Sequence, residues 1–313
     1  MRVVLCIPAD DGAPWLDLFR AAMPDAQIAL RDVTVAENAD TAQADYAVTA
    51  GRCETLFDEQ RHLKAVFALS AGVGHLLALP NLPRDMPLYR LEDAGMAAQM
   101  IRYVLSAALR FAQRMDAYAR QQRDARWEQH PPRDPATIAI GVMGLGVIGA
   151  QIARALAAQG FAVRGYTRSS RTVAAVEVFA GSAQFPAFLS GIDFLVNVLP
   201  NTPGTRGVLN RSTLARLADG AHVLNIGRGA ALVEEDLLML LDSGKLSGAT
   251  LDVFNEEPLP AHHPFWRRAD ILVTPHISGL TLPSDAVAQV AGKIARLERG
   301  EPVSGIVDIE RGY

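Results

Sequence analysis

The 313-residue sequence contains only two cysteines, Cys6 and Cys53, and neither has a neighbour at the spacing of a zinc site or disulfide framework. Two isolated thiols are typical of a reducing compartment, so we expect a cytoplasmic protein. The sequence has no long basic run and a formal net charge of -4, which argues against a nucleic-acid partner. No stretch approaches the roughly 18 apolar residues of a membrane helix. The first apolar run ends at Pro8, too early for a signal peptide.

Short apolar segments alternate with helical stretches along the whole chain. Their near-continuous apolar character is typical of strands buried on both faces, and the alternation predicts parallel sheets with helices on either side. The length favours about two domains. The expected strands cover residues 2–8, 44–50, 64–70, 86–92, 137–143, 161–166, 176–180, 193–198, 222–226, 248–253 and 271–275.

A long helix is expected from about Gly95 to Gln122, and a last helix over roughly 284–298. Apolar residues recur in the first helix at steps of three and four, and the band that they form is wide for a surface helix. Two compatible explanations stay open, namely burial between two domains of the chain and packing on a second subunit. The polar, proline-rich segment 131–136 follows as a connector.

Gly144, Gly146 and Gly149 form a GxGxxG pattern between a predicted strand and a predicted helix, which is typical of a dinucleotide-binding turn. Gly144 would allow the tight turn, Gly146 would let the backbone approach a pyrophosphate, and Gly149 would let the helix pack closely on the strand. The free N–H groups at the helix start would then bind the phosphates.

The residues after the next predicted strand favour NADP over NAD. An acidic residue at this place would bind the ribose hydroxyls of NAD, but the sequence here is YTRSSR, residues 166–171. Arg168 and Arg171 can pair with a 2′-phosphate, and the hydroxyls of Thr167 and Ser169 can donate to it. The alternative is a solvated basic loop.

Polar residues at three later strand ends indicate acid–base chemistry. Arg228, Asp252 and His276 each lie at the end of an expected strand, and Glu256 and Glu257 lie just after the second of these. Ligands bind at the carboxyl ends of parallel strands. A histidine beside a carboxylate is a common proton donor, and an arginine can bind a substrate carboxylate through two hydrogen bonds.

These segments together resemble the D-2-hydroxyacid dehydrogenases, and among them the glyoxylate/hydroxypyruvate reductases. The resemblance covers essentially the whole chain and is carried by KAVFALSAGVGHLL, LEDAGMAAQM, GLGVIG, YTRSSR, LPNTPGT, GRGAALVEEDLL, TLDVFNEEPLP, TPHISG and the terminal RGY. It implies an α/β fold of two doubly wound parallel-sheet domains. A Rossmann cofactor domain of residues 95–281 would be inserted in a flavodoxin-like substrate domain of residues 1–94 and 282–313. It also implies a homodimer formed through the 95–122 region.

The resemblance also implies an activity and roles for single residues. Arg228 would hold the carboxylate and 2-oxo group of a small 2-oxo acid, glyoxylate or hydroxypyruvate, which NADPH reduces. His276 would be the general acid, and Glu257, directly before Pro258, would hold its imidazole. The implied substrate-binding residues are Ala71, Gly72, Val73, Gly74, Arg228 and His276. The implied cofactor-binding residues are Gly144, Gly146, Val147, Ile148, Gly149, Thr167, Arg168, Ser169, Arg171, Leu199, Pro200, Thr205, Ile226, Gly227 and Asp252.

The sequence departs from the family pattern near the expected substrate. Gly74 stands where a polar residue such as aspartate is usual, Ala98 replaces a glutamate, and TAGR at 49–52 replaces an aromatic, histidine-containing segment. Two alternatives therefore stay open: an NAD-dependent enzyme for a bulkier 2-oxo acid, and a non-catalytic dinucleotide-sensing protein of the same fold. His75 borders the substrate loop. His262 and His263 lie in a polar loop, where we expect no metal site.

Overall fold

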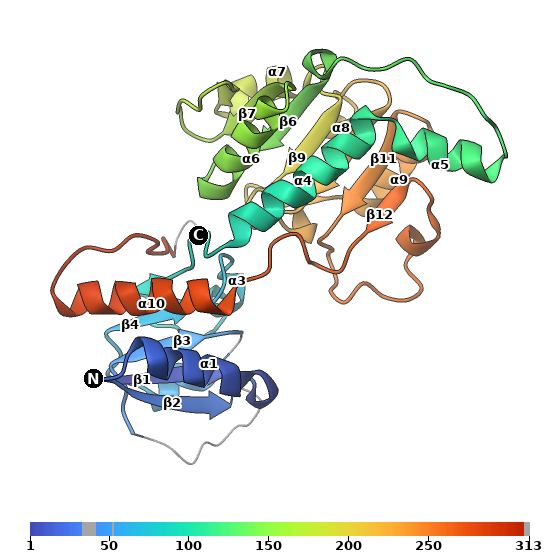
Figure 1. Cartoon of the computed structure of the whole chain (residues 1–313). Coiled ribbons are helices and arrows are strands. Elements are labelled where there is room, and N and C mark those ends of the chain that lie inside the picture. The colour runs from blue at the N-terminus through green and yellow to red at the C-terminus, as the bar shows by residue number, and fades with distance from the viewer. Residues whose placement is uncertain (33–41, 52, 310–313) are drawn as a thin grey trace. The chain divides into compact units, whose positions relative to one another are not determined.

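The computed structural model describes residues 1–32, 42–51 and 53–309 (Figure 1). Arg52 of the TAGR segment and the terminal RGY lie outside the described residues. The chain forms two compact units. Unit 1 comprises Met1–Gly95 and Thr281–Tyr313, and unit 2 comprises Met96–Leu280. Within the described part of the chain, no helix has the length and apolar character needed to cross a membrane.

Unit 1 contains a parallel sheet of five strands in the order β2-β1-β3-β4-β5, which is the flavodoxin-like order. The strands are β1 (Arg2–Ile7), β2 (Gln27–Asp32), β3 (Tyr46–Thr49), β4 (Ala65–Ala68) and β5 (Leu88–Tyr89). The helices are α1 (Ala9–Ala22), α2 (Leu56–Glu59), α3 (Gly74–Leu77) and α10 (Pro283–Glu298). The two long helices, α1 and α10, pack against each other although they are far apart in the sequence.

Strand β2 was not predicted from the sequence, and its position at the sheet edge explains why. Only Ile28 and Arg31 of this strand are buried, so the segment lacks the continuous apolar run of the central strands. Edge strands are half exposed and carry polar side chains. The expected strand at 86–92 is also shorter than predicted, with only Leu88 and Tyr89 in the sheet.

Unit 2 contains a parallel sheet of seven strands in the order β12-β11-β10-β9-β6-β7-β8. The strands are β6 (Ala139–Met143), β7 (Ala162–Thr167), β8 (Glu177–Ala180), β9 (Phe194–Asn197), β10 (Ala221–Asn225), β11 (Leu246–Leu251) and β12 (Ile271–Val273). The strand order reverses between β6 and β9, and ligands bind at such a switch point. Both sheets confirm the predicted fold class of two doubly wound parallel-sheet units.

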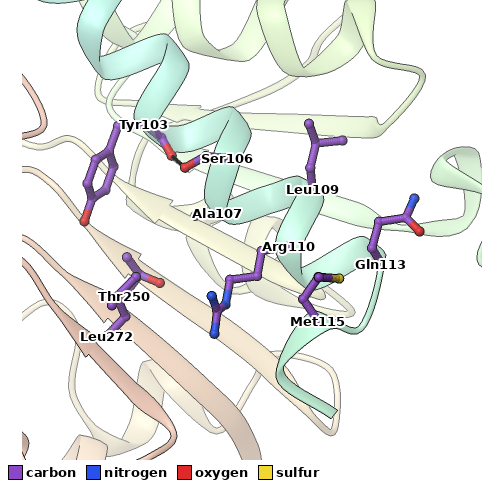
Figure 2. A pocket seen from close by; sticks show the side chains of 9 residues that line it. All are labelled: Tyr103, Ser106, Ala107, Leu109, Arg110, Gln113, Met115, Thr250 and Leu272. Carbon is purple, nitrogen blue, oxygen red and sulfur yellow. Dashed lines mark hydrogen bonds between the residues drawn. The ribbon is translucent and has the colours of Figure 1, made fainter. Parts of the chain in front are cut away.

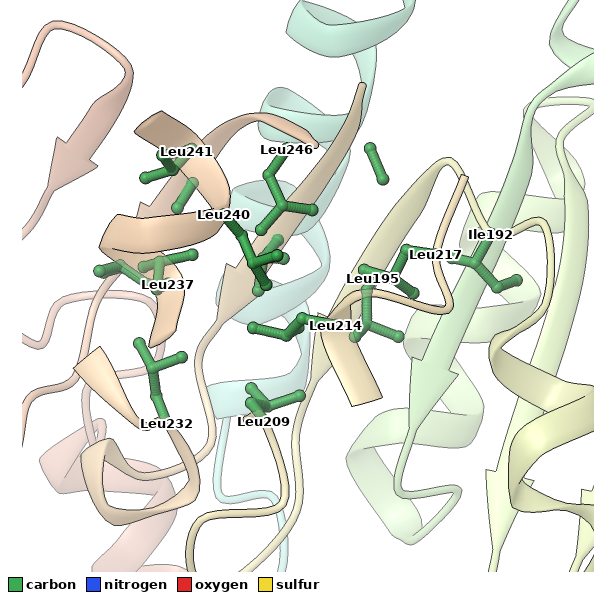
Figure 3. Packing of buried hydrophobic residues seen from close by; sticks show 14 of the residues in the cluster. Ile192, Leu195, Leu209, Leu214, Leu217, Leu232, Leu237, Leu240, Leu241 and Leu246 are labelled. Carbon is green, nitrogen blue, oxygen red and sulfur yellow. The ribbon is translucent and has the colours of Figure 1, made fainter. Parts of the chain in front are cut away.

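The helices of unit 2 cover this sheet and bury a leucine-rich core (Figure 3). They are α4 (Met96–Ala112), α5 (Met115–Arg123), α6 (Val147–Ala158), α7 (Phe185–Leu189), α8 (Arg211–Leu214) and α9 (Glu234–Asp242). Four 3-10 turns lie at η1 (Pro135–Thr137), η2 (Ser182–Gln184), η3 (Gly229–Ala231) and η4 (Pro264–Arg267). In the core, Leu209 and Leu232 form a backbone bridge, which holds the loop after β9 against the loop after β10.

The expected single helix at 95–122 is wrong in one respect, because it breaks into α4 and α5. Arg114 adopts a left-handed backbone conformation with φ 54°, which ends α4 and starts α5 in a new direction. The side chains of Arg110 and Asp116 form an ion pair at 2.5 Å across the break. Neither glycine nor proline marks this position, so the apolar spacing alone does not reveal it.

Candidate active site

The glycine-rich turn joins β6 to α6 and is shaped by close backbone contacts. Gly144 has φ +102°, a conformation that favours glycine. A Cβ atom at Gly149 would lie 1.8 Å from the carbonyl oxygen of Gly144, so Gly149 lets the helix pack on the turn itself. Apart from Gly146 and its two chain neighbours, no described residue has an atom within 4 Å of the place that a Cβ atom would take at Gly146, and no side chain caps the start of α6. The turn is therefore open to a ligand that accepts hydrogen bonds from backbone N–H groups.

Positive charge lies beside this turn. Arg168, Ser169 and Arg171 are exposed residues directly after β7. The guanidinium group of Arg171 donates a hydrogen bond to the carbonyl oxygen of Leu145, inside the glycine-rich turn. No acidic residue occurs between positions 161 and 176. A 2′-phosphate would thus meet cations and hydroxyl groups here, without a carboxylate to repel it.

Two buried asparagines, which were not predicted from the sequence, organise the next loops. Asn197 ends β9 and Asn225 ends β10, and both are fully buried. The Asn225 side-chain oxygen accepts hydrogen bonds from Asn197 Nδ2 at 2.9 Å and from the Gly227 N–H at 3.2 Å. Asn225 Nδ2 donates to the carbonyl oxygen of Arg228 at 3.1 Å. This network fixes the backbone that carries Arg228.

The loop after β9 contains the expected cofactor residues Leu199, Pro200 and Thr205. The Thr205 hydroxyl donates to the Pro200 carbonyl oxygen at 2.6 Å and accepts from the Thr202 N–H at 2.9 Å. The loop is thus closed by its own hydrogen bonds. The expected residue Ile226 is buried at the end of β10.

Arg228 lies between β10 and η3 and is half-buried. Its Nη1 atom donates to the carbonyl oxygen of Gly227 at 2.6 Å. A Cβ atom at Gly229 would lie 1.9 Å from the Phe254 backbone, so this glycine lets the loops after β10 and β11 touch. Burial lowers the pKa of the Arg228 guanidinium, and the nearby charge of Glu257 raises it. An arginine side chain is not deprotonated in proteins, so the group stays cationic.

Glu257 and His276 form a direct pair. Glu257 Oε2 lies 2.8 Å from His276 Nδ1, and Glu257 Oε1 accepts a hydrogen bond from the Phe254 N–H at 2.8 Å. The carboxylate is therefore fixed at both oxygens. Because the contact uses Nδ1, the Nε2 atom of His276 is left to exchange a proton with a ligand. The His276 side chain is 44% exposed, so a ligand can reach it.

The segment that carries His276 is held by Asp252, which is fully buried. The Asp252 carboxylate accepts hydrogen bonds from the Thr274 hydroxyl at 2.6 Å, the Ile277 N–H at 2.8 Å and the Ser278 N–H at 2.9 Å. His276 itself has a left-handed backbone with φ 54°. Asp252 was predicted to bind the cofactor, and its contacts here are with the histidine segment. The contribution of Thr274 was not predicted.

The expected substrate loop belongs to unit 1, whereas Arg228, Glu257 and His276 belong to unit 2. Ala71 and Gly72 follow β4, Val73 is buried and Gly74 starts α3. The Ser70 hydroxyl donates to the Gly72 carbonyl oxygen at 2.7 Å and shapes the loop. His75 is half-buried in α3.

His263 has a structural environment in its loop. Its Nδ1 atom accepts a hydrogen bond from the Phe265 N–H at 3.4 Å, which caps the start of η4. Its Nε2 atom lies 3.2 Å from Glu234 Oε2. The side chain thus joins η4 to α9, while the neighbouring His262 is exposed.

Known proteins are similar to this chain over its whole length. Residues 105–278 match the family D-isomer specific 2-hydroxyacid dehydrogenase, NAD binding domain. The chain is 43% identical over 318 residues to glyoxylate/hydroxypyruvate reductase A of Serratia proteamaculans, with 100% of both chains covered.

Two solved structures are similar over the same extent. A D-isomer specific 2-hydroxyacid dehydrogenase from Xanthobacter autotrophicus Py2, in complex with NADPH and MES, has a TM-score of 0.95 and 38% identity, covering 100% of this chain and 99% of that one. An NADPH-dependent glyoxylate/hydroxypyruvate reductase from Sinorhizobium meliloti, in complex with NADP and sulfate, has a TM-score of 0.91 and 35% identity, with coverage of 100% and 99%. The chain belongs to the D-isomer specific 2-hydroxyacid dehydrogenase family.

Proposed function

We propose that this protein is an NADPH-dependent reductase of small 2-oxo acids, with glyoxylate and hydroxypyruvate as substrates. The Glu257–His276 pair, with contact between Nδ1 and Oε2 at 2.8 Å, is the observation that carries the proposal. Similarity to the reductases of Serratia proteamaculans and Sinorhizobium meliloti supports the choice of substrates. We assign residues 95–281 to the cofactor domain, and residues 1–94 with 282–313 to the substrate domain.

In the proposed mechanism, Arg228 binds the substrate carboxylate and orients the 2-oxo group. His276 gives a proton from Nε2 to the carbonyl oxygen as negative charge develops there. Glu257 holds the imidazole through Nδ1 and offsets the positive charge of its protonated form. We propose the backbone N–H groups of Ala71 to Gly74 as further donors to the substrate. When bound, NADPH supplies the hydride that reduces the carbonyl carbon.

The residues at the glycine-rich turn fit NADPH. The uncapped start of α6, with Gly146, Val147 and Ile148, would bind the pyrophosphate. Arg168 and Arg171 would bind the 2′-phosphate, with Thr167 and Ser169 as further donors. We propose that the loops at 199–205 and 226–227, with Asp252, complete the site on the nicotinamide side.

A turnover assay with a panel of 2-oxo acids and both cofactors tests the proposal. His276→Ala should lower kcat by a factor on the order of 10² to 10⁴, the usual contribution of general acid–base catalysis. The matched control is His262→Ala, which removes an exposed histidine of the same unit and should leave kcat unchanged. Near-normal turnover of His276→Ala would refute the assignment. Binding of NADPH without turnover of any 2-oxo acid would favour a dinucleotide sensor.

We also propose that two copies of the chain form a homodimer through α4 and α5. A hollow of about 430 Å³ opens on this face of unit 2 (Figure 2). Leu109, Met115 and Leu272, which line it, are large apolar residues that are 40%, 50% and 45% exposed. Clustered exposed apolar side chains are typical of subunit contacts. Leu109→Asp should turn a dimer into a monomer in sedimentation experiments, and an unchanged mass would contradict this.

We further propose that the enzyme acts in the cytoplasm. Cys6 and Cys53 are free thiols buried in one unit, which supports a reducing compartment. Fractionation of cells that express the full chain, followed by activity measurement, tests this. Activity confined to another compartment would contradict it.

A further inference from the structure

A chain of hydrogen bonds leads from α4 to the segment that carries His276. The hydroxyl groups of Tyr103 and Thr274 lie 2.7 Å apart, and the Thr274 hydroxyl lies 2.6 Å from Asp252 Oδ1. A carboxylate only accepts hydrogen bonds, so Thr274 must donate its single hydroxyl proton to Asp252. Tyr103 must then be the donor to Thr274. The direction of the chain is therefore fixed, from phenol to hydroxyl to carboxylate.

The environment of Tyr103 keeps it in the form that this chain needs. Burial raises the pKa of Tyr103 to about 12, and the negative charge of Asp252 also raises it, although the bond to Thr274 acts in the opposite direction. The phenol is therefore protonated at neutral pH. Tyr103 also lines the hollow on α4 with Thr250 and Leu272 (Figure 2).

Asp252, at the other end of this hydrogen-bond chain, fixes a backbone conformation that a histidine does not favour. His276 has φ 54°, and holding a non-glycine residue in the left-handed region requires compensating contacts. Asp252 supplies these contacts on both sides, because it binds Thr274 before the histidine and the N–H groups of Ile277 and Ser278 after it. Without this support we would expect the imidazole to lose its defined position against Glu257.

We propose that Tyr103 is a positioning residue for His276, acting through Thr274 and Asp252. Its hydroxyl satisfies the Thr274 oxygen and thereby holds Thr274 in the orientation that donates to Asp252. The proposal rests on the proposed function only for the role of His276 as the acid. The effect of Tyr103 on the position of the His276 imidazole can be measured directly by spectroscopy, without an activity assay.

Tyr103→Phe in the full chain tests this, because it removes one oxygen and keeps the ring. We expect kcat with glyoxylate and NADPH to fall ~3- to 10-fold, as for the loss of one buried hydrogen bond, with KM for NADPH unchanged. Tyr118→Phe is the matched control, since it removes a hydrogen-bonded phenol of α5 that is not part of the Tyr103–Thr274–Asp252 hydrogen-bond chain.

Substitutions at Thr274 test the same hydrogen-bond chain independently. Thr274→Val should reproduce the effects of Tyr103→Phe, and Thr274→Ser, which keeps the hydroxyl, should restore the activity. The double variant Tyr103→Phe with Thr274→Val should be no worse than the more damaging single change, because both act through one chain. Additive losses would overturn the proposal.

Spectra of enzyme labelled with ¹⁵N-histidine separate this inference from the proposed function. The His276 signal is identified by its disappearance in His276→Asn. In Tyr103→Phe this signal should change its chemical shift, while the His222 signal stays in place. A His276 signal identical to that of the unchanged enzyme would overturn the positioning role even if His276→Ala is inactive. If the His276 signal moves in Tyr103→Phe but His276→Ala keeps its activity, only the proposed function is refuted.

Discussion

The preference for NADPH over NADH can be tested by removing Arg168 and Arg171 together. Both residues are exposed, and Arg171 is anchored by its hydrogen bond to the Leu145 carbonyl oxygen in the glycine-rich turn. The guanidinium group of Arg171 therefore stands next to the turn that would hold the pyrophosphate. In the double variant Arg168→Ala with Arg171→Ala, we expect KM for NADPH to rise steeply.

The magnitude follows from the number of contacts and their exposure. A hydrogen bond to a charged group contributes about 1.5 to 3 kcal/mol. Because both arginines are exposed, solvent and salt screen them, and the lower value applies. Two contacts then give about 3 kcal/mol, which corresponds to a preference on the order of 10²-fold. KM for NADH should change little, since NADH has no 2′-phosphate.

The assay is steady-state kinetics with both cofactors at low and high ionic strength. The NADPH preference should shrink as ionic strength rises, because the contacts are electrostatic. Arg164→Ala is the matched control: it removes a cation from β7 that pairs with Glu177 at 3.2 Å, away from the turn. If the unchanged enzyme uses NADH as well as NADPH at low salt, the segment 166–171 is only a solvated basic loop. Equal increases of both KM values in the double variant would indicate damage to the turn instead.

Three further predictions follow from single contacts. Glu257→Gln keeps the size of the side chain but removes the charge beside His276, so kcat should fall by a factor on the order of 10² in the same assay. Gly149→Ala would place a Cβ atom 1.8 Å from the Gly144 oxygen, and titration should show ~10- to 100-fold weaker binding of both NADPH and NADH. Burial lowers the pKa of His222 to about 4 in the folded protein, against about 6.5 in the unfolded chain. The neutral imidazole therefore contributes its full stability above about pH 6.5, and this contribution is lost as pH falls toward 4. Urea unfolding should show a loss of up to about 3 kcal/mol over that range, and a smaller loss in His222→Phe. An equal loss in His222→Phe would contradict the assignment.

The sequence predicts those parts of the site that depend on local backbone chemistry. The turn at Gly144 is predictable because its glycines allow a positive φ and a close approach of the backbone. Glu257 and His276 are 19 residues apart, and their contact became predictable only through the family resemblance. Apolar runs predict central strands well because such strands are buried on both faces.

The features that were missed depend on contacts between distant residues. The roles of Asn197 and Asn225 need two neighbouring strands in register, which the sequence does not specify on its own. Thr274 is an ordinary residue until the fold brings it to Asp252, 22 positions earlier. The left-handed backbone at Arg114 likewise has no signal in the sequence, since arginine has no preference for that conformation.

The division of unit 1 into two stretches of sequence has a consequence for biosynthesis. Helix α10 packs on α1, and Glu298 near its end receives hydrogen bonds from Tyr46 at 2.7 Å and Lys64 at 2.8 Å. All residues of unit 2 are synthesised after Lys64 and before Glu298. At about 5 to 20 residues per second, the ribosome needs on the order of 10 to 40 s to cross this interval. During that time the strands of unit 1 are synthesised but lack α10, whereas unit 2 is contiguous and can fold first. The nascent N-terminal segment is thus the part of the chain that a chaperone would have to protect.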